Sequence, residues 1–295
     1  MTGEVLFGMH SIYTVLVDDR RMQCRIKGKV LKADARAWNP IAPGDLVEID
    51  AEGRILAIAA RRTSLERWNK IGKAPQVLAA NADAAVCVTS PQSPPFRPRF
   101  IDRLIVAAEA GGLSPVIVLN KDDLPCAPET AARLERYTEM GYLLLRCSAH
   151  TGAGIDRLAA ALEGKTAVFV GQSGVGKSSV LNSLEPGLDL KVGGLSAKYN
   201  RGSHTTNYPV LIRSAGGLRI IDTPGIRELE LADILPEEVA FHFRDFAPSA
   251  GACRVPSCLH DGEPGCAVAA AAECGEIHPD RYESYRRILS ELRHG

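Results

Sequence analysis

The sequence predicts a multidomain protein in which a small N-terminal β-barrel precedes an α/β domain with a doubly wound sheet, and a helical, metal-binding domain follows. Three observations support this fold class. Short apolar runs alternate with turn residues at the start, strand and helix patterns alternate in the middle, and four cysteines cluster near the end. A chain of 295 residues has room for two or three domains, which we place at 1–64, 65–232 and 233–295.

Composition favours a soluble globular protein. Apolar residues make up 45% of the chain, and no run of eighteen apolar residues is present, which argues against a membrane span. The start of the chain lacks the basic residues and apolar run of a secretory signal, so we expect a cytoplasmic location. The 35 basic residues are balanced by 35 acidic ones, which argues against a protein that coats nucleic acid through bulk charge.

Residues 1–64 have the pattern of a small barrel. Four apolar runs, at 12–17, 22–26, 46–49 and 55–59, are separated by turn residues, and no amphipathic helix of normal length appears. Closure of a barrel removes exposed sheet edges, and the OB-fold is the commonest small barrel of this size. The alternative is another five-stranded barrel that binds no ligand.

A local excess of basic residues lies within this part of the chain. It forms either an RNA-binding surface or a solvated strand edge, because lysine and arginine are common on edge strands. The residues are Arg20, Arg21, Arg25, Lys27, Lys29, Lys32 and Arg36, with Asp34 as the one acidic residue among them.

Strands and helices alternate in the middle of the chain, after a polar stretch at 61–81 that reads as a linker or docked loop. Such alternation predicts a mostly parallel sheet, whose ligands bind beyond the carboxyl ends of the strands. Strands are expected at 84–88, 115–119, 142–146 and 167–170, and helices at 100–110, 129–140 and 155–162.

A phosphate-binding loop follows the strand at 167–170. Its glycines let backbone N–H groups point at phosphate oxygens, and the helix that begins near Lys177 adds its positive N-terminus. Lys177 would neutralise the β- and γ-phosphates, and the Ser178 hydroxyl would bind Mg²⁺. The segment comprises Gly171, Gln172, Ser173, Gly174, Val175, Gly176, Lys177, Ser178 and Ser179.

A second motif, Asp222-Thr223-Pro224-Gly225, ends the apolar run 218–221. Asp222 could hold the Mg²⁺ shell, and the Gly225 N–H could bond the γ-phosphate. Asp-x-x-Gly is a weak signal alone, but its place after an apolar strand and a phosphate loop makes it specific.

A third motif, Asn120-Lys121-Asp122-Asp123, would select the base. The Asp123 carboxylate can accept two hydrogen bonds from guanine, whereas adenine would leave it unpaired. Lys121 would pack over the base, and Asn120 would brace the loop. Ser148 and Ala149, after the next strand, resemble a loop that contacts guanine through its backbone. This motif argues against an ATPase or a kinase.

The order of the motifs indicates a circular permutation. An ordinary GTPase has the phosphate loop first and Asn-Lys-x-Asp last, but here Asn120 precedes Gly171 by about fifty residues. The strands that normally follow Asp-x-x-Gly have moved upstream, so the chain runs from Gly225 to the cysteine cluster within about thirty residues. We expect the segment from 225 to about 231 to be both a switch and the tether of the C-terminal domain.

The glutamine that orients the attacking water in many GTPases is replaced by Ile226. His204, between the phosphate loop and Asp222, could orient or deprotonate that water, and Thr205 or Thr206 could complete the Mg²⁺ shell. The alternative for a loop histidine is a solvent-exposed position. If no residue replaces the glutamine that Ile226 lacks, the chain would be a nucleotide-gated binding module that hydrolyses little nucleotide.

The cysteine cluster favours a structural metal site in a cytosolic chain. Cys253, Cys258, His260 and Cys266 offer three thiols and one imidazole, which suits tetrahedral zinc, and Cys274 or His278 could substitute. Helices are expected on either side of the cluster, at 237–246 and 281–292. The remaining cysteines read as ordinary thiols, and these are Cys24, Cys87, Cys126 and Cys147.

Taken together, these motifs make the chain resemble the RsgA-type circularly permuted GTPases of bacterial ribosome biogenesis. The resemblance rests on the permuted order, the segment 202–206, the string 222–228, the Cys-Cys-His-Cys spacing, and residues 76–83 at the entry to the GTPase domain. It extends over nearly the whole chain. One departure is Ser203, where the family often has arginine.

The resemblance implies an OB-fold that contacts 16S ribosomal RNA, a GTPase domain with Mg²⁺, and a C-terminal zinc domain. It implies a monomeric late assembly or checkpoint factor whose GTP hydrolysis is stimulated by the small (30S) ribosomal subunit. It also implies that His204 is the catalytic histidine, that Thr206 is the switch threonine, and that Cys253, Cys258, His260 and Cys266 bind zinc.

Overall fold

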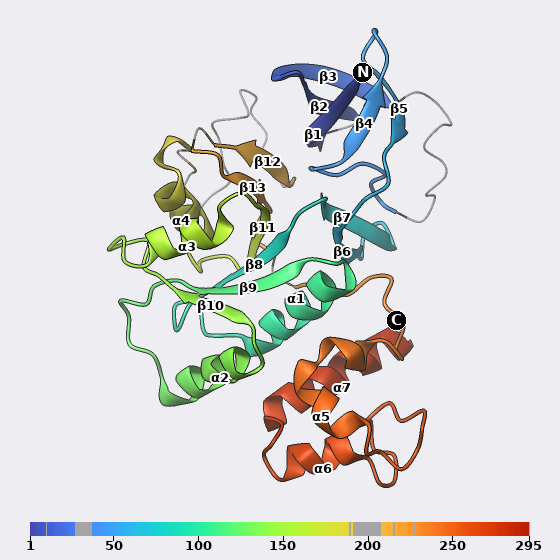
Figure 1. Cartoon of the computed structure of the whole chain (residues 1–295), viewed down its shortest axis with the longest axis vertical. Helices are drawn as coiled ribbons and strands as arrows, with labels where there is room; N and C mark the ends of the chain where they lie inside the picture. Colours follow the sequence, from blue (N-terminus) through green and yellow to red (C-terminus); the bar gives the residue numbers. More distant parts are fainter. Residues whose placement is uncertain are drawn as a thin grey trace.

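A closed five-stranded barrel forms the N-terminal part of the structure. The structure is a computed structural model, and it describes residues 1–9, 11–26, 37–188, 190, 208–214, 216–226 and 228–294. The strand order is β1-β2-β3-β5-β4, and only β3 and β5 are parallel neighbours, the arrangement of an OB-fold. Figure 1 shows the barrel at one end of the molecule. Its strands are β1 (Thr2–Met9), β2 (Ile12–Val17), β3 (Arg20–Ile26), β4 (Leu46–Ile49) and β5 (Arg54–Ile58).

Alternation of apolar residues fills the barrel. The side chains of Val5, Val15, Val47 and Ile55 are fully buried, as the pleat of a half-exposed strand requires. Three of the basic residues, Arg20, Arg21 and Arg25, lie on β3. The others, Lys27, Lys29, Lys32 and Arg36, lie outside the described residues, as does Asp34.

The polar stretch at 61–81 packs on the central domain, as a docked loop would, but it is a regular element and not a linker. It forms an antiparallel hairpin of β6 (Ser64–Asn69) and β7 (Ala74–Ala80). One face of the hairpin is apolar, with Leu65 and Leu78 in the same core as the first helix of the central domain. Its polar outer face concealed the alternation in the sequence.

A six-stranded sheet organises the central domain, in the order β10-β9-β8-β11-β13-β12. Every neighbouring pair is parallel except β12–β13, so the doubly wound prediction is confirmed. The strand before the phosphate loop, β11, lies near the middle. The strands are β8 (Ala84–Thr89), β9 (Ser114–Leu119), β10 (Leu143–Arg146), β11 (Thr166–Gly171), β12 (Val210–Arg213) and β13 (Arg219–Asp222).

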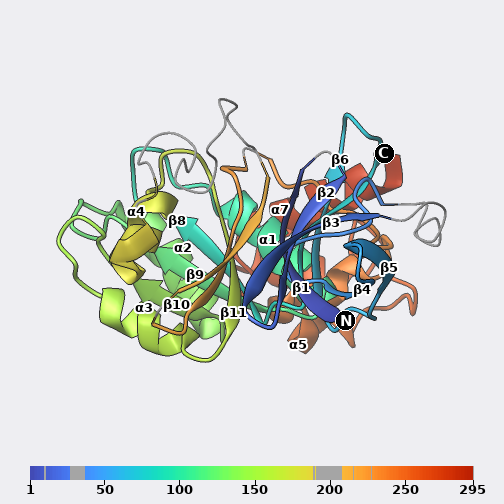
Figure 2. The ribbon, with the colours of Figure 1, turned by 90° about the horizontal axis from the view of Figure 1, so that it is seen from above.

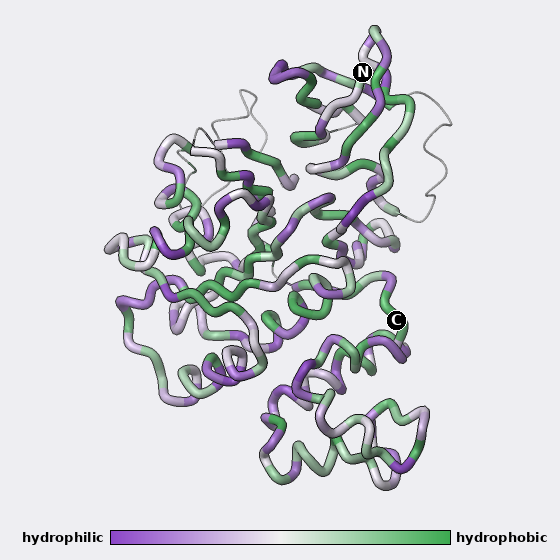
Figure 3. The backbone as a smooth tube through the Cα atoms, viewed as in Figure 1, coloured by the Kyte–Doolittle hydropathy of each residue, from purple (hydrophilic) through white to green (hydrophobic). Residues whose placement is uncertain are grey.

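Helices cover both faces of this sheet (Figure 2). Alternate residues of β8 and β11 pack with α1 and α2 on one face and with α3 and α4 on the other. Figure 3 shows the resulting apolar band along the central strands. The helices are α1 (Pro98–Ala110), α2 (Pro128–Glu139), α3 (Ile155–Leu162) and α4 (Lys177–Leu184), and a 3-10 turn, η2 (Pro186–Leu188), follows α4.

The C-terminal part is helical but differs from the sequence prediction at 237–246. Two 3-10 turns, η3 (Val239–His242) and η4 (Arg244–Phe246), replace the expected α-helix. The backbone of Phe243 leaves the helical region, so the rings of Phe243 and Phe246 both pack on Tyr285, at centroid distances of 5.2 and 4.8 Å. The other helices are α5 (Ala247–Ala250), α6 (Ala267–Glu273) and α7 (Pro279–His294).

A buried ionic network joins α7 to the central domain. The Asp102 carboxylate on α1 is fully buried and accepts hydrogen bonds from Arg281 at 2.6 Å, Arg133 at 2.9 Å and the Tyr137 hydroxyl at 2.7 Å. Burial alone would raise the pKa of Asp102, but Arg281 and Arg133 outweigh burial and hold that pKa below its usual range. Asp245 pairs with the other side of Arg281.

None of the helices in the described ranges has the length and apolar character needed to cross a bilayer.

Replacing Asp102 by Asn should destabilise the protein by about 3–5 kcal/mol, because the Arg133 and Arg281 guanidinium groups would stay buried without their counter-ion. Denaturant unfolding would measure this change. The control is Glu283→Gln, which removes an exposed pair with Arg287 and should cost less than about 1 kcal/mol. Equal effects of the two substitutions would show that the network does not hold α7 in place.

Candidate functional site

The three sequence motifs meet at one edge of the central sheet. Because β8, β9, β10, β11 and β13 are parallel, their carboxyl ends lie at the same edge. The Asn-Lys-x-Asp motif follows β9, residues 147–149 follow β10, the phosphate loop follows β11, and Asp222 ends β13. Motifs separated by up to a hundred residues therefore form one site.

The phosphate loop has a backbone that its glycines make possible. Gly174 and Gly176 have positive φ angles of 87° and 88°, which a side chain would strain. A Cβ atom on Gly176 would also lie 2.3 Å from the Asn120 side-chain nitrogen. The chain thus turns tightly into α4, whose N-terminus faces the loop.

Asn120 ties the motifs together and is 2% exposed. Its amide nitrogen donates to the Val175 carbonyl at 2.9 Å, and its amide oxygen accepts from the Ala149 backbone N–H at 3.0 Å. The Lys121 ammonium donates to the Gly174 carbonyl at 2.8 Å and to the Ser93 carbonyl. The Asn120 side chain therefore braces both the phosphate loop and the loop after β10, which is the role expected for it.

The Lys177 ammonium forms an ion pair with the Asp222 carboxylate, and the Lys177 residue is 8% exposed. This contact places a cation, a carboxylate and the first turn of α4, with Ser178, at the end of the loop. Carboxylate and hydroxyl oxygens are suitable ligands for Mg²⁺. The Thr223 hydroxyl donates to the Phe169 carbonyl at 2.7 Å and fixes the motif to β11.

Asp123 and Ser148 face a cavity of about 510 Å³ that is large enough for a purine base. A hydrogen bond from the Ser148 side chain, with smaller contributions from His150 and Lys121, holds the pKa of the Asp123 carboxyl below its usual value. The group is therefore ionised at neutral pH and can accept from two donors. Asp122 instead forms an exposed pair with Arg146 at 3.0 Å.

Ile226 turns away from the phosphate loop. Its side chain is 3% exposed and lies in the apolar cluster that contains α1 and α7 residues, while its N–H donates to the Gly171 carbonyl at 3.2 Å. Ile226 cannot orient water from that position. The residues expected to do so, His204 with Thr205 or Thr206, lie outside the described residues together with Ser203.

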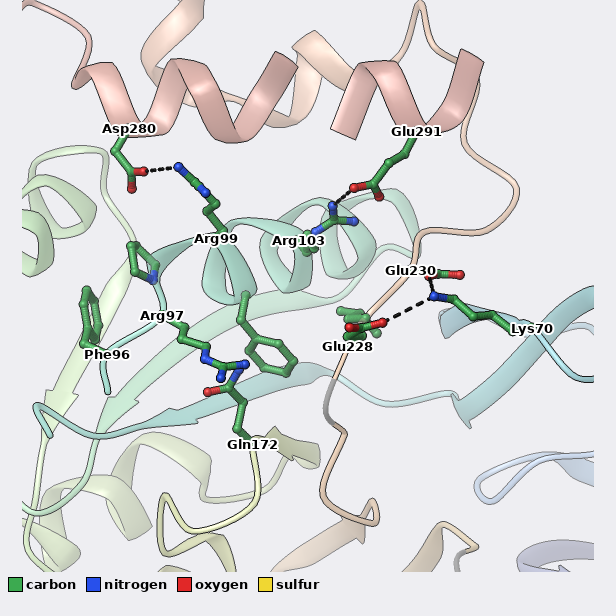
Figure 4. A pocket seen from close by; sticks show the side chains of 13 residues that line it. Lys70, Phe96, Arg97, Arg99, Arg103, Gln172, Glu228, Glu230, Asp280 and Glu291 are labelled. Atoms are coloured by element: carbon green, nitrogen blue, oxygen red, sulfur yellow. Dashed lines mark hydrogen bonds and ion pairs between the residues drawn. The ribbon is translucent and has the colours of Figure 1, made fainter. Parts of the chain in front are cut away.

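The segment after Gly225 is held by contacts that the sequence did not indicate. Lys70, at the tip of the β6–β7 hairpin, pairs with both Glu228 and Glu230. The Trp68 N–H donates to the Glu230 carbonyl at 2.9 Å. Figure 4 shows Lys70, Glu228 and Glu230 around a cavity of about 590 Å³ that Gln172 of the phosphate loop also lines. The hairpin therefore holds the segment that leaves Asp222.

The cysteine cluster has the residues and the geometry to hold a metal ion. The side-chain ligand atoms of Cys253, Cys258, His260 and Cys266 all lie within 4.8 Å of one another. The His260 Nδ1 atom is 3.4 Å from the Cys253 sulfur and 3.5 Å from the Cys266 sulfur. Zn–S and Zn–N bonds of about 2.3 and 2.0 Å at a tetrahedral angle would separate such atoms by about 3.5 Å. The four ligands therefore fit a closed tetrahedral site.

The two possible substitutes lie elsewhere. The Cys274 thiol is exposed and donates to the Ala271 carbonyl at 3.4 Å. The His278 Nδ1 atom accepts from the Asp280 N–H at 3.1 Å. In the described part of the chain, neither joins the four-residue cluster.

Comparison with known families fits this geometry. The model of the RsgA GTPase family matches residues 58–232, more than half of the chain. The chain belongs to the RsgA GTPase family. It is therefore a GTP-hydrolysing enzyme with a circularly permuted GTPase domain.

Curated members of the RsgA family are similar over most of their length. The "Small ribosomal subunit biogenesis GTPase RsgA" of Moorella thermoacetica is 41% identical, over 99% of this chain and 97% of its own. The protein of the same name from Azotobacter vinelandii is 44% identical, over 90% of this chain and 80% of its own.

Two solved structures have a similar fold over nearly the whole chain. YjeQ from Thermotoga maritima superposes with a TM-score of 0.75 at 32% identity, covering 100% of this chain and 99% of that one. YloQ, described as a circularly permuted GTPase, superposes with a TM-score of 0.67 at 30% identity, covering 99% of this chain and 94% of that one.

Replacing Asp123 by Asn should weaken GTP binding by about 10²-fold or more, because the new amide would donate where the carboxylate is expected to accept two hydrogen bonds. Xanthosine triphosphate should then bind better than GTP. Calorimetric titration with both nucleotides would measure the change. Asp156→Asn, which alters another acidic residue at the same cavity, is the control and should keep the preference for GTP. An unchanged preference in Asp123→Asn would show that Asp123 does not contact the base.

Replacing Cys258 by Ser should reduce bound zinc from about one ion per chain to a small fraction and unfold residues around α6, because a structural metal contributes folding free energy. Elemental analysis and circular dichroism of the purified protein would measure both effects. Cys274→Ser is the matched control and should keep its zinc. Full zinc in Cys258→Ser would contradict the four-ligand assignment.

Proposed function

We propose that this GTPase is a late assembly or checkpoint factor of the small (30S) ribosomal subunit, and that it binds ribosomal RNA and is stimulated by the subunit. The observation that carries the proposal is the Asn120 bridge, which joins the Asn-Lys-x-Asp motif to the phosphate loop and to the loop after β10, as a guanine-nucleotide site requires. The names of the RsgA relatives supply the partner. Three basic residues on β3 of the barrel support contact with RNA.

We assign the nucleotide contacts as follows. Asp123 and Lys121 bind the base, Asn120, Asp122, Ser148 and Ala149 shape its pocket, and Lys177 binds the β- and γ-phosphates. Ser178, Asp222 and Thr206 hold Mg²⁺, whose role is to neutralise charge that develops on the phosphates. The remaining contacts come from Gly225 and from Gly171, Gln172, Ser173, Gly174, Val175, Gly176 and Ser179.

His204 supplies the catalytic function that Ile226 cannot. We propose that its imidazole orients the attacking water or takes its proton when the subunit is bound. The burial of Ile226 away from the phosphate loop supports this assignment, because it leaves no glutamine-like group at the usual position.

Zinc is the metal that we propose for the Cys253, Cys258, His260 and Cys266 centre. We further propose that the protein acts in the cytoplasm as a monomer, with functional domains at 1–64, 65–232 and 233–295. The barrel ends at Ile58, before the first limit, and the match to the family model ends at residue 232, which supports the second limit.

Purified small subunits should increase phosphate release from GTP but not from ATP, and large subunits should not. His204→Ala should lower the stimulated rate by roughly 10²- to 10⁴-fold, the usual range for a lost acid–base group, with little change in GTP affinity. Parallel Thr205→Ala and Thr206→Ala variants would identify the switch threonine. If small subunits leave the rate unchanged, the protein is a GTPase with another partner.

A further inference from the structure

One carboxylate of the barrel holds two arginines of the central sheet. Glu4, in β1, accepts hydrogen bonds from Arg213 of β12 at 2.6 and 3.1 Å, through Oε2. Its other oxygen accepts from Arg219 of β13. The Glu4 side chain is 9% exposed, whereas those of Arg213 and Arg219 are 40% and 33% exposed.

The arginines need this carboxylate because of their register. Arg213 and Arg219 are directly opposite one another in the antiparallel pair of β12 and β13. Like charges in that position repel and weaken strand pairing. The sheet offers Arg219 one neutral acceptor, the Thr166 hydroxyl at 2.8 Å. Asp19 is 3.8 Å from Arg213 but 95% exposed, so it cannot replace Glu4.

The opposite end of the same hairpin lies in the nucleotide site. Val210 at the start of β12 pairs with Asp222 at the end of β13, the residue that contacts Lys177. Figures 1 and 2 both show β12 beside the barrel. The two strands therefore connect the Glu4 contact to Asp222 through four residue pairs.

We propose that Glu4 is a positioning residue that couples the barrel to hydrolysis. Its carboxylate neutralises the Arg213–Arg219 pair only while the barrel is docked on the sheet. A partner that binds the barrel and shifts its position therefore changes the β12–β13 hairpin, and through the hairpin the position of Asp222. This inference rests on the proposed stimulation by the small subunit. It adds a route by which contact at the barrel reaches the phosphates.

The first test is the ratio of subunit-stimulated to basal GTP turnover. Glu4→Gln keeps the size of the side chain but removes its charge, and the ratio should fall by about 5-fold or more, within the usual range for coupling between sites. Basal turnover and the KM for GTP should stay within about twofold of the wild type. Glu4→Asp, which retains the charge, should keep part of the stimulation.

Arg213→Gln breaks the same contact from the other side and guards against misfolding of the Glu4 variant. It should lower the ratio similarly, and the double variant should be no worse than either single one, because both remove one interaction. Asp19→Asn is the control and should be stimulated like the wild type. Normal stimulation of both Glu4→Gln and Arg213→Gln would overturn the inference.

Hydrogen exchange of the free protein separates this inference from the proposed function. Glu4→Gln should speed exchange at residues 210–213 and 219–222, whether or not subunits stimulate the enzyme. If subunits do not stimulate the wild type, the proposed function fails, and unchanged exchange would then refute the Glu4 contact as well. If subunits do not stimulate the wild type but exchange is faster in Glu4→Gln, Glu4 still positions the β12–β13 hairpin, and only the link to the subunit is lost.

Discussion

The short connection from Asp222 into the apolar core between α1 and α7 is the constraint on which the rest of the structure depends. Within four residues the chain passes from the nucleotide site to the buried side chain of Ile226, and Leu229 and Leu231 follow it into the same core. Each such side chain stabilises the packed state by about 1.5–3 kcal/mol. The segment that follows Asp222 therefore cannot move without disturbing the packing against α1 and α7.

Circular permutation makes this arrangement possible. In the usual order, the chain after Asp-x-x-Gly returns to the sheet, but here those strands precede the phosphate loop and the chain is free to enter another domain. The buried network of Asp102, Arg133 and Arg281 holds that domain against α1 and α2. The Glu4 contact holds the barrel against the β12–β13 hairpin, which ends at Asp222. Both flanking domains thus contact elements that carry the nucleotide site.

Much of the site could be predicted from the sequence, because its motifs are local and their strands are strongly apolar. The tight turns at Gly174 and Gly176 and the place of Asp222 after a strand follow from a few adjacent residues. The four residues of the Cys-Cys-His-Cys cluster lie within fourteen residues of one another, so their spacing indicates that they could come together.

Other features depend on residues that are distant in the chain. The pairs Glu4–Arg213 and Asp102–Arg281 join residues about two hundred positions apart, and no local pattern marks them. The β6–β7 hairpin was missed because its outer face is polar. The segment 237–246, expected as a helix, forms the two turns η3 and η4 instead. The packing of Phe243 and Phe246 on Tyr285 outweighs local helix propensity there.

The most direct test of the central claim is hydrogen exchange of the free protein with GDP and with a non-hydrolysable GTP analogue. If the segment after Gly225 is both switch and tether, the γ-phosphate should change protection at residues 226–245, beyond the nucleotide pocket. Protection in the metal centre itself should stay constant. Identical exchange at 226–245 in both nucleotide states would contradict the account, even if the phosphate loop responds normally.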